Sequence, residues 1–553
     1  MCVVLFSLRP KGSLNVFDPS KFCVTNIDME SMLALEREAQ DHQHDVAKII
    51  ASGASDVEKF YAGSNIFLTG GTGFIGKHII EKLFRCCNVN KVYLLLRSKK
   101  GKTVQQRIDQ ILKDPVFESL QKYKPDFVTN IIPIEGDISE KELGIGADDR
   151  NIITEQVNVI IHAAANVNFN ENVKAATLIN VRGIREIVRL AKCCKQLRSI
   201  VHVSTAYSHA SKSRVRQAVK EQFYDSPIPP NAIIEMAETI EKNKLENMMQ
   251  QLLEDYPNTY TFSKAVAEEV IRTEARGLPI CIVRPSIVIS SYREPLPGWV
   301  DPWNLNSPSG FVLGAYTGII HVARSTGDVV ISFVPVDIVT NTILVAAQEN
   351  AKRQPDLDNT KIYNVTNNRN PLLWGQYIKI NNTSGRNLIS SRAIWYCFFI
   401  ETPYKLLSVL LFWLLHFVPA FLVDIACKLI GKRPILIQTY KKIYKLTSAL
   451  EFFMNNEWKF QDDNTLNLYL NLSNIDRDIF NCDMATIDNK EMTHLWAYGV
   501  RKYIIKDVNV KNADQVARKQ FLLKIVTYFI LVLYIYVFYK IIMTGYSIFT
   551  KFV

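Results

Sequence analysis

The sequence lacks the cysteine spacings that hold a structural metal. Its ten cysteines include two adjacent pairs, Cys86-Cys87 and Cys193-Cys194, but no Cys-x-x-Cys pair and no Cys/His arrangement of the zinc type. We therefore expect no metal. Adjacent cysteines on helices are typical of buried packing residues in a reducing compartment, so we expect the region that contains them to face the cytosol.

The chain also lacks a basic run interleaved with aromatic residues, although its formal net charge is +11. The lysines and arginines are dispersed, which argues against a nucleic-acid partner. A basic surface that faces anionic lipid or a phosphorylated ligand explains the charge more simply. The first residues form an apolar stretch too short for a signal peptide, without a basic leader. We expect residues 1–55 to be a polar, loosely structured extension.

Apolar residues, by contrast, are abundant and crowd into the last third of the 553-residue chain. Residues 406–423 are almost wholly apolar and could lie in a membrane, re-enter it or cover a groove for an apolar chain; the sequence leaves these alternatives open. Residues 521–542 supply the roughly 20 apolar residues that a transmembrane helix needs. We expect a linker with the apolar segment at 371–448 and a compact helical domain at 449–515.

A glycine-rich turn stands near the start of the remaining region. Residues 68–76 read Leu-Thr-Gly-Gly-Thr-Gly-Phe-Ile-Gly, after a short apolar segment typical of a buried strand and before apolar residues at helical spacing. Such a turn lets backbone N–H groups approach a pyrophosphate at the positive end of the helix. The pattern predicts a dinucleotide site made by Thr69, Gly70, Gly71, Thr72, Gly73, Phe74, Ile75 and Gly76.

Strands and helices then alternate, which predicts a parallel, doubly wound sheet of the Rossmann type over residues 56–370. Strands are expected at 91–96, 127–133, 157–162, 199–204 and 280–284, and a helix at 178–194. At the end of the second strand an acidic residue would bind a ribose 2′-hydroxyl, but this chain has Arg97 and Lys99. These cations favour a 2′-phosphate, so we expect NADPH as the cofactor rather than NADH.

Candidate catalytic groups follow further along the chain. Tyr260 and Lys264 are four residues apart, so both project from one face of a helix. A cation beside a phenol is expected to lower its pKa and make it a proton donor and acceptor near neutrality. Ser204 and Thr205 stand at the carboxyl end of a predicted strand, the edge where open α/β sheets bind ligands. Thr205, with Ser204 as the close competitor, could hydrogen-bond a substrate oxygen.

Together these motifs resemble the extended short-chain dehydrogenase/reductase superfamily. The elements, in chain order, are Thr69 to Gly76, Gly136-Asp137-Ile138, His162-Ala163-Ala164-Ala165, Ser204-Thr205, Tyr260 with Lys264, and Arg284-Pro285-Ser286. The resemblance implies that Asp137, with Ile138, contacts the adenine and that Ala163 and Ala164 line the cofactor. It also implies that Lys264 holds the ribose and that Pro285 and Ser286 flank the nicotinamide. Asn180, a helix asparagine, is placed in the cofactor site by the same resemblance.

A closer resemblance is to the fatty acyl-CoA reductases of the insect type. It rests on Phe60-Tyr61-Ala62-Gly63, Pro297-Gly298-Trp299-Val300-Asp301, Phe333-Val334-Pro335-Val336-Asp337 and Glu457-Trp458-Lys459-Phe460. It implies NADPH-dependent reduction of a long-chain fatty acyl-CoA to a primary alcohol through a thiohemiacetal and an aldehyde, with release of CoA. The expected setting is the endoplasmic reticulum membrane, or alternatively the peroxisomal membrane, with the catalytic domain in the cytosol.

Two alternatives remain beside that expectation. A membrane-bound NAD(P)-dependent dehydrogenase of the same superfamily could use the same tyrosine and lysine on a sterol or a nucleotide sugar. A non-enzymatic redox-sensing scaffold is the other, but the intact set of Thr205, Tyr260 and Lys264 disfavours it, because a scaffold has no need of these groups.

Overall fold

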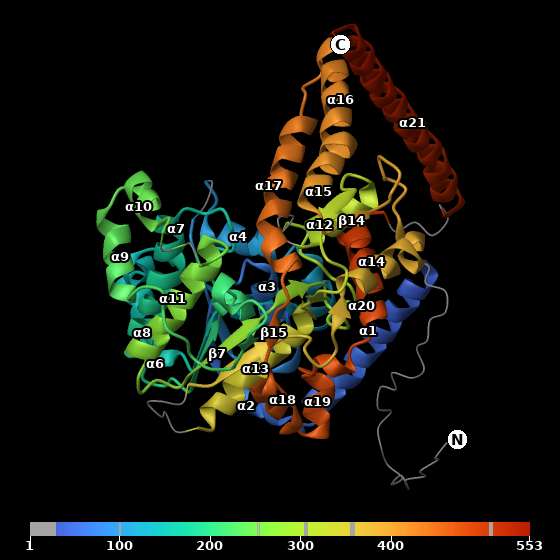
Figure 1. Ribbon diagram of the computed structural model, residues 1–553. Coiled ribbons are helices and arrows are strands. Elements are labelled where there is room, and N and C mark those ends of the chain that lie inside the picture. Colours follow the sequence, from blue (N-terminus) through green and yellow to red (C-terminus); the bar gives the residue numbers. More distant parts are fainter. Residues whose placement is uncertain are drawn as a thin grey trace, which may run out of the picture.

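A seven-stranded sheet forms the centre of the computed structural model (Figure 1), which describes residues 29–98, 101–251, 253, 255–303, 308–353, 360–507 and 513–552. Every strand pair in this sheet is parallel. The order is β12-β7-β5-β4-β1-β2-β3. The strands are β1 (Asn65–Thr69), β2 (Lys91–Leu96), β3 (Ile131–Glu135), β4 (Val159–His162), β5 (Ser199–Val203), β7 (Ile280–Pro285) and β12 (Ile362–Val365).

The predicted doubly wound sheet is confirmed. Strand β1 pairs with β2 on one side and with β4 on the other, so the direction of winding reverses between β1 and β4. Ligands of such sheets bind at the carboxyl ends of the strands at this reversal. The third strand begins later than predicted, at Ile131, because Pro125 opens a 3₁₀ helix at Pro125–Asn130.

Helices cover both faces of the sheet. Alternating strand residues divide between them: Ile66 and Leu68 face one hydrophobic core and Phe67 faces the other. The main helices of the first face are α3 (Phe74–Cys86) and α13 (Val336–Ala351), and those of the second are α8 (Gly183–Ala191) and α11 (Thr259–Glu274). Shorter helices complete the domain: α2 (Asp56–Tyr61), α4 (Val104–Ile111), α5 (Glu118–Tyr123), α6 (Ala147–Gln156), α7 (Val173–Ala176), α9 (Pro230–Thr239), α10 (Lys242–Met249) and α12 (Pro308–Thr317).

The C-terminal part is mainly helical, as predicted, and packs directly on the sheet domain. Its helices are α14 (Trp374–Asn382), α18 (Asp463–Leu470), α19 (Asn474–Ile479) and α20 (Asn489–Gly499). The two-residue strand β15 (Lys459–Phe460) pairs with β6 (Ala218–Val219) of the sheet domain. Asn364 of β12 donates hydrogen bonds to the carbonyls of Val219 and Gln461. Backbone pairing and side-chain hydrogen bonds therefore join the C-terminal part to the sheet domain.

The N-terminal extension is ordered over α1 (Met29–Ala51), which corrects the expectation of a loose segment there. One face of α1 is buried on the body of the protein. Glu36 forms an ion pair with Lys502, and Gln43 donates a hydrogen bond to the carbonyl of Pro295. The buried apolar residues of this face have spacings of three, four or seven, as one stripe of a helix requires: Met32, Leu35, Ala39, Val46 and Ile50. Residues 1–28 lie outside the described part.

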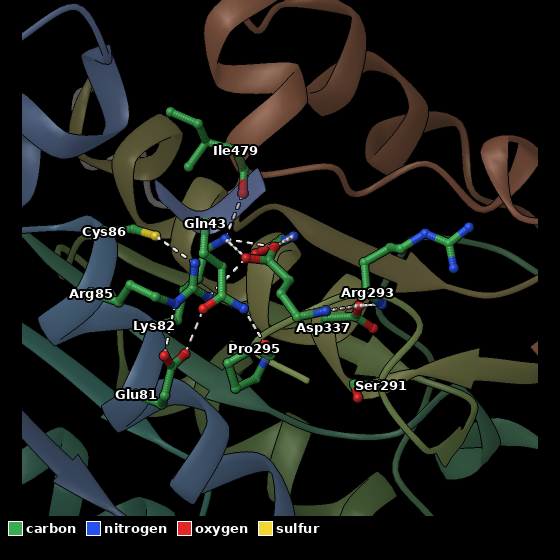
Figure 2. A network of polar contacts seen from close by, with 12 residues as sticks. Gln43, Glu81, Lys82, Arg85, Cys86, Ser291, Arg293, Pro295, Asp337 and Ile479 are labelled. Atoms are coloured by element: carbon green, nitrogen blue, oxygen red, sulfur yellow. Dashed lines mark hydrogen bonds and ion pairs between the residues drawn. The ribbon is translucent and has the colours of Figure 1, made fainter. Parts of the chain in front are cut away.

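A buried network of charges joins α3 to the loop before α12 and to the C-terminal part (Figure 2). The Glu294 carboxylate accepts hydrogen bonds from Lys82 at 2.6 Å and from Arg85 at 2.8 Å. Lys82 also donates to the carbonyl of Ile479, at the end of α19, at 2.5 Å. Because all these charges are partnered, the network fixes three chain segments against one another.

Three apolar or amphipathic helices project from this body (Figure 1). The first runs through α15 (Lys405–Phe412), a π-helical turn and α16 (Val418–Leu429), and α17 (Leu436–Met454) returns beside α16. The third projecting helix is α21 (Ala513–Phe552). Among the described residues, Lys405–Leu429 and Gln515–Thr544 are long and apolar enough to cross a membrane, by length and composition.

Candidate active site

The glycine turn lies between β1 and α3 and has the shape that a pyrophosphate requires. Gly70 has φ +79°, and a Cβ there would lie 2.6 Å from the backbone of Ala163 and Ala164. A Cβ on Gly76 would lie 2.2 Å from the Gly70 oxygen, so only glycine lets α3 pack this closely on the turn. Gly73 caps α3 without a side-chain hydrogen bond, which leaves the first N–H groups of the helix for an anion.

The corner at the ends of β2 and β3 brings Arg97 and Asp137 together. Arg97 donates to the Asp137 carboxylate at 3.1 Å, and Arg107 of α4 donates to the Arg97 carbonyl. Burial alone would raise the pKa of Asp137, but hydrogen bonds from Ser139 and Arg97 outweigh it and hold this pKa below its usual value. Arg107 is a cation that the sequence reasoning missed. The predicted Lys99 lies outside the described residues.

Tyr260 stands in the first turn of α11, where the Asn258 side chain caps the helix by accepting from the Thr261 N–H. The Thr205 side chain lies close to its phenol, and its ring stacks on Phe169 at a centroid distance of 5.8 Å. Burial raises the pKa of Tyr260 to about 12, and Thr205 lowers it only in part. The expected lowering of the phenol pKa is thus corrected: loss of solvent dominates, and the structure keeps the phenol protonated.

Lys264 lies one helical turn further, with its side chain buried under the sheet edge. Its ammonium donates to the carbonyl of Val203, the last residue of β5, at 2.8 Å. Burial lowers the pKa of Lys264 to about 8, while the nearby Glu268 carboxylate opposes this shift. Tyr260, Thr205 and Lys264 are therefore brought together at the carboxyl edge of the sheet, beside the glycine turn.

Glu268, one turn beyond Lys264, is the most densely bonded group near the site, and the sequence reasoning missed it. Arg284 donates to its two oxygens at 2.9 and 2.5 Å, and His209 Nε2 lies 2.9 Å away. Ser204 donates to Glu268 at 2.6 Å, so its hydroxyl proton is already engaged. Burial alone would raise the pKa of Glu268, but Arg284 and His209 hold it well below its usual range. The sequence did offer one sign of this role: Glu268 follows Lys264 by four residues, so both lie on the same face of a helix.

The other predicted cofactor residues surround the same edge. The backbone of Ala163 and Ala164 donates to Thr69, directly beside Gly70. Ile138 follows Asp137 and packs against Gly183 of α8. Thr72, Phe74 and Ile75 lie in the turn and first turn of α3.

The Asn180 side chain joins two segments of the chain. Asn180 lies in a π-helical segment, η5 (Thr177–Arg182), that replaces the first turn of the helix predicted at 178–194. Its amide exchanges hydrogen bonds with the backbone of Asn166 and donates to Ser263 at 2.9 Å. These bonds fix the segment after β4 against α11.

At the end of β7, the carbonyl of Pro285 accepts from Thr205 at 3.3 Å. The Ser286 hydroxyl is buried and has no hydrogen-bond partner among the described residues. A buried hydroxyl without a partner fits a site that receives a polar group, such as a carboxamide, from a ligand.

A cluster of aromatic rings forms the wall behind Tyr260. Phe169 contacts Phe453, from the last turn of α17, and Tyr207 packs against Phe453, Trp458 and Phe460. Trp496 belongs to the other core, where it donates to Ser309. In the described part of the chain, no group of three or more His, Cys, Asp or Glu side chains could hold a metal ion.

Two family models with the description "Male sterility protein" match this chain. The NAD-binding model matches residues 68–343, and the Sterile model matches residues 415–507. The sequence is 37% identical over 475 residues to "Fatty acyl-CoA reductase wat" of Drosophila melanogaster, covering 86% of this chain and 90% of that protein. The chain belongs to the fatty acyl-CoA reductase family. Fatty acyl-CoA reductase 1 of Rattus norvegicus is 36% identical over 459 residues, which are 82% of this chain and 86% of that one.

Solved reductase domains share the fold. The terminal R domain from the myxalamid PKS-NRPS biosynthetic pathway has a TM-score of 0.51 at 21% identity, over 80% of this chain and 91% of that one. The R domain of a nonribosomal peptide synthetase from Mycobacterium tuberculosis has a TM-score of 0.50 at 14% identity, over 86% and 99%. With the NAD-binding family model, this fold and the glycine turn support a nicotinamide cofactor for this reductase.

Proposed function

We propose that this reductase converts a long-chain fatty acyl-CoA to the primary alcohol with NADPH as the reductant. The observation that carries the proposal is the placement of Tyr260 close to Thr205, with Lys264 one turn away, at the carboxyl edge of the sheet where the glycine turn also lies. The relatives named as fatty acyl-CoA reductases support this choice of substrate.

Tyr260 and Thr205 act on the oxygen of the reacting carbonyl. Negative charge develops on that oxygen when hydride adds to the thioester carbon, and the two hydroxyls donate hydrogen bonds to it. A thiohemiacetal results; its C–S bond breaks, CoA leaves as the thiol, and an aldehyde remains. The aldehyde oxygen takes the same place, and Tyr260 gives it the proton of the alcohol. NADPH, when bound, supplies the hydride, and each alcohol consumes two.

The residues at the cofactor's two ends fit NADPH. The free N–H groups at the start of α3 would hold the pyrophosphate, and the unpartnered Ser286 hydroxyl would bind the nicotinamide carboxamide. Arg97 and Arg107 lie together at the end of β2, where a ribose 2′-phosphate would add the negative charge that these cations attract. Lys264 would hold the nicotinamide ribose.

The setting of the reaction forms part of the proposal. The two apolar helical stretches fit a membrane enzyme. We assign the catalytic domain to the cytosolic side of the endoplasmic reticulum, with the peroxisomal membrane as the alternative. The eight cysteines in the described part are all free thiols, which agrees with a reducing compartment.

The test is to incubate membranes from cells that express the chain with NADPH and a panel of acyl-CoAs, and to measure lipid products. Alcohol is expected, and Tyr260→Phe should lower its formation by roughly 10²- to 10⁴-fold because the general acid is lost. Tyr123→Phe, at an exposed tyrosine, is the matched control and should change nothing. Alcohol formation that survives Tyr260→Phe would remove the acid role. Turnover of a sterol but of no acyl-CoA would overturn the substrate.

A further inference from the structure

The hairpin formed by α15, α16 and α17 leaves the body and returns to it at the same strand. Before α15, β14 (Ile400–Thr402) pairs with β9 (Val322–Arg324). At the end of α17, Glu451 forms an ion pair with Arg324 at 3.2 Å, and Asn455 donates to the Arg324 carbonyl at 3.2 Å. Both ends of the hairpin are therefore on the side of the membrane where the catalytic domain lies.

The outgoing helix alone has the properties of a transmembrane span. Lys405–Leu429 is 25 residues long. At 1.5 Å per residue this is about 37 Å, enough for a hydrocarbon core of about 30 Å. Large apolar side chains are exposed along it, from Leu406 (85%) to Leu429 (82%). If this helix crossed the bilayer, however, α17 would have to cross back.

The returning helix α17 is unsuited to cross. It carries Lys441, Lys442 and Lys445, all exposed, between about 8 and 14 Å from its start in a helix of about 28 Å. None of the three forms an ion pair with any residue that the structure describes. Cations within a membrane are expected to pair or to face a bundle interior, and these do neither. The hairpin as a whole therefore does not fit a double crossing.

The turn between the two helices is also basic. Lys428, Lys432 and Arg433 are exposed there. The nearby acid, Asp424, is occupied: its carboxylate accepts the backbone N–H groups of residues 435–437, at the start of α17, at 2.9 to 3.1 Å. Cations thus lie both at the turn and along α17, next to the exposed apolar side chains of α16.

We propose that the hairpin of α15, α16 and α17 lies along the interface of the leaflet that faces the catalytic domain, with its cations on anionic lipid headgroups. Only an orientation along the interface places the turn and the middle of α17 at headgroup level together. The apolar side chains of α15 and α16 then enter the hydrocarbon. Phe453, at the body end of α17, contacts Phe169, which stacks on Tyr260. The leaflet and the aromatic wall of the site are thereby joined through one helix.

The position of the turn is tested on the full chain in sealed vesicles with the catalytic domain outside. Ile430→Cys, at an exposed residue of the turn, is placed in a Cys427→Ser background and treated with a membrane-impermeant maleimide; peptide mass spectrometry reads each cysteine. Native Cys193, exposed on the catalytic domain, is the reference. We expect Cys at 430 to be labelled within about twofold of Cys193, as an interfacial site should be. Labelling that needs permeabilisation, or no labelling at all, would overturn the proposal.

The headgroup contact is tested by an environment-sensitive dye on the same cysteine. Vesicles of phosphatidylcholine are compared with vesicles that contain about 30% phosphatidylserine, at low and high salt. Phosphatidylserine should shift the dye emission to the blue, and salt should reverse the shift. Lys441→Glu with Lys442→Glu and Lys445→Glu should abolish it, whereas the control set Lys102→Glu, Lys122→Glu and Lys242→Glu should not. An equal response in pure phosphatidylcholine, or in both variants, would overturn the proposal. Neither readout depends on reductase activity.

Discussion

The edge of the sheet and the projecting hairpin place charge and apolar surface in opposite ways. At the edge, Lys264, Glu268 and Arg284 are buried and charged groups meet partners at hydrogen-bond distance. On the hairpin, several leucines, Trp413 and Phe421 are exposed, and the cations have no ion-pair partner in the described part. Charged residues are seldom fully buried unless they are paired, and large apolar patches seldom stay exposed without a partner. Each region departs from the average where a ligand or a membrane would complete it.

The largest effect is expected from removing the buried carboxylate of Glu268. Glu268→Ala leaves Arg284 buried without its partner, so we expect the free energy of unfolding to fall by about 3–5 kcal/mol. Glu238→Ala is the matched control, because Glu238 pairs with Arg182 and Lys141 nearer the surface. That change should cost at most about 1 kcal/mol. Urea unfolding in detergent measures both, and equal losses would mean that burial does not distinguish the two sites.

A second comparison uses one residue type in both regions. Leu83 of α3 is fully buried, whereas Leu406 of α15 is 85% exposed. Leu83→Ala should lower the free energy of unfolding by about 2–5 kcal/mol because it leaves a cavity. Leu406→Ala should change it by less than about 0.5 kcal/mol in detergent. A large loss from Leu406→Ala would show that the hairpin packs against protein rather than lipid.

Arg97, at the ends of β2 and β3, is a cation that is half exposed but is expected to meet the charge of a ligand. Arg97→Ala should raise the KM for NADPH by roughly 10- to 100-fold, the value of a lost charge-assisted hydrogen bond. The KM for NADH serves as the control within the same variant and should not change. Steady-state kinetics with both cofactors measures this. Equal effects on NADPH and NADH would remove the 2′-phosphate role.

The smallest expected effect is a pH dependence from Lys264, whose pKa burial lowers to about 8 from 10.5. Loss of the ammonium should lower kcat/KM about tenfold per pH unit above that value. Stability should change in the other direction: between these two pKa values the unfolded chain binds the extra proton, so the contribution of Lys264 to stability rises with pH. Measurements of kcat/KM and of thermal unfolding between pH 7 and about 10 test the two expectations. A rate that rises through pH 8 would contradict the assignment.

The local parts of the fold and site could be predicted from the sequence. The glycine turn, the strand at 91–96 and the pair Tyr260 and Lys264 depend on a few neighbouring residues, and the structure has each of them where the pattern predicts. The third strand, predicted at 127–133, begins only at Ile131, because residues 127–130 belong to a 3₁₀ helix that Pro125 opens.

Features that depend on distant partners were missed. Helix α1 has the apolar spacing of a helix stripe, but its many charged residues resemble a solvated segment until α3 and α20 are placed against it. Glu268 looks like an ordinary surface carboxylate until Arg284 of β7 and His209 are folded over it. The phenol pKa was mispredicted for the same reason, because burial is a property of the whole fold.

The pairing of β6 with β15 sets an order of events during synthesis. Val219 and Phe460 lie in the same two-stranded sheet, yet the whole hairpin is translated between them. Chains emerge from the ribosome N-terminal end first, and a long-range contact must wait for its second partner. The rings of Phe453, Trp458 and Phe460 therefore close over Tyr207 only after α15 and α16 have left the ribosome. In the proposed orientation of the hairpin, a nascent reductase would meet the lipid surface before the wall of its active site is finished.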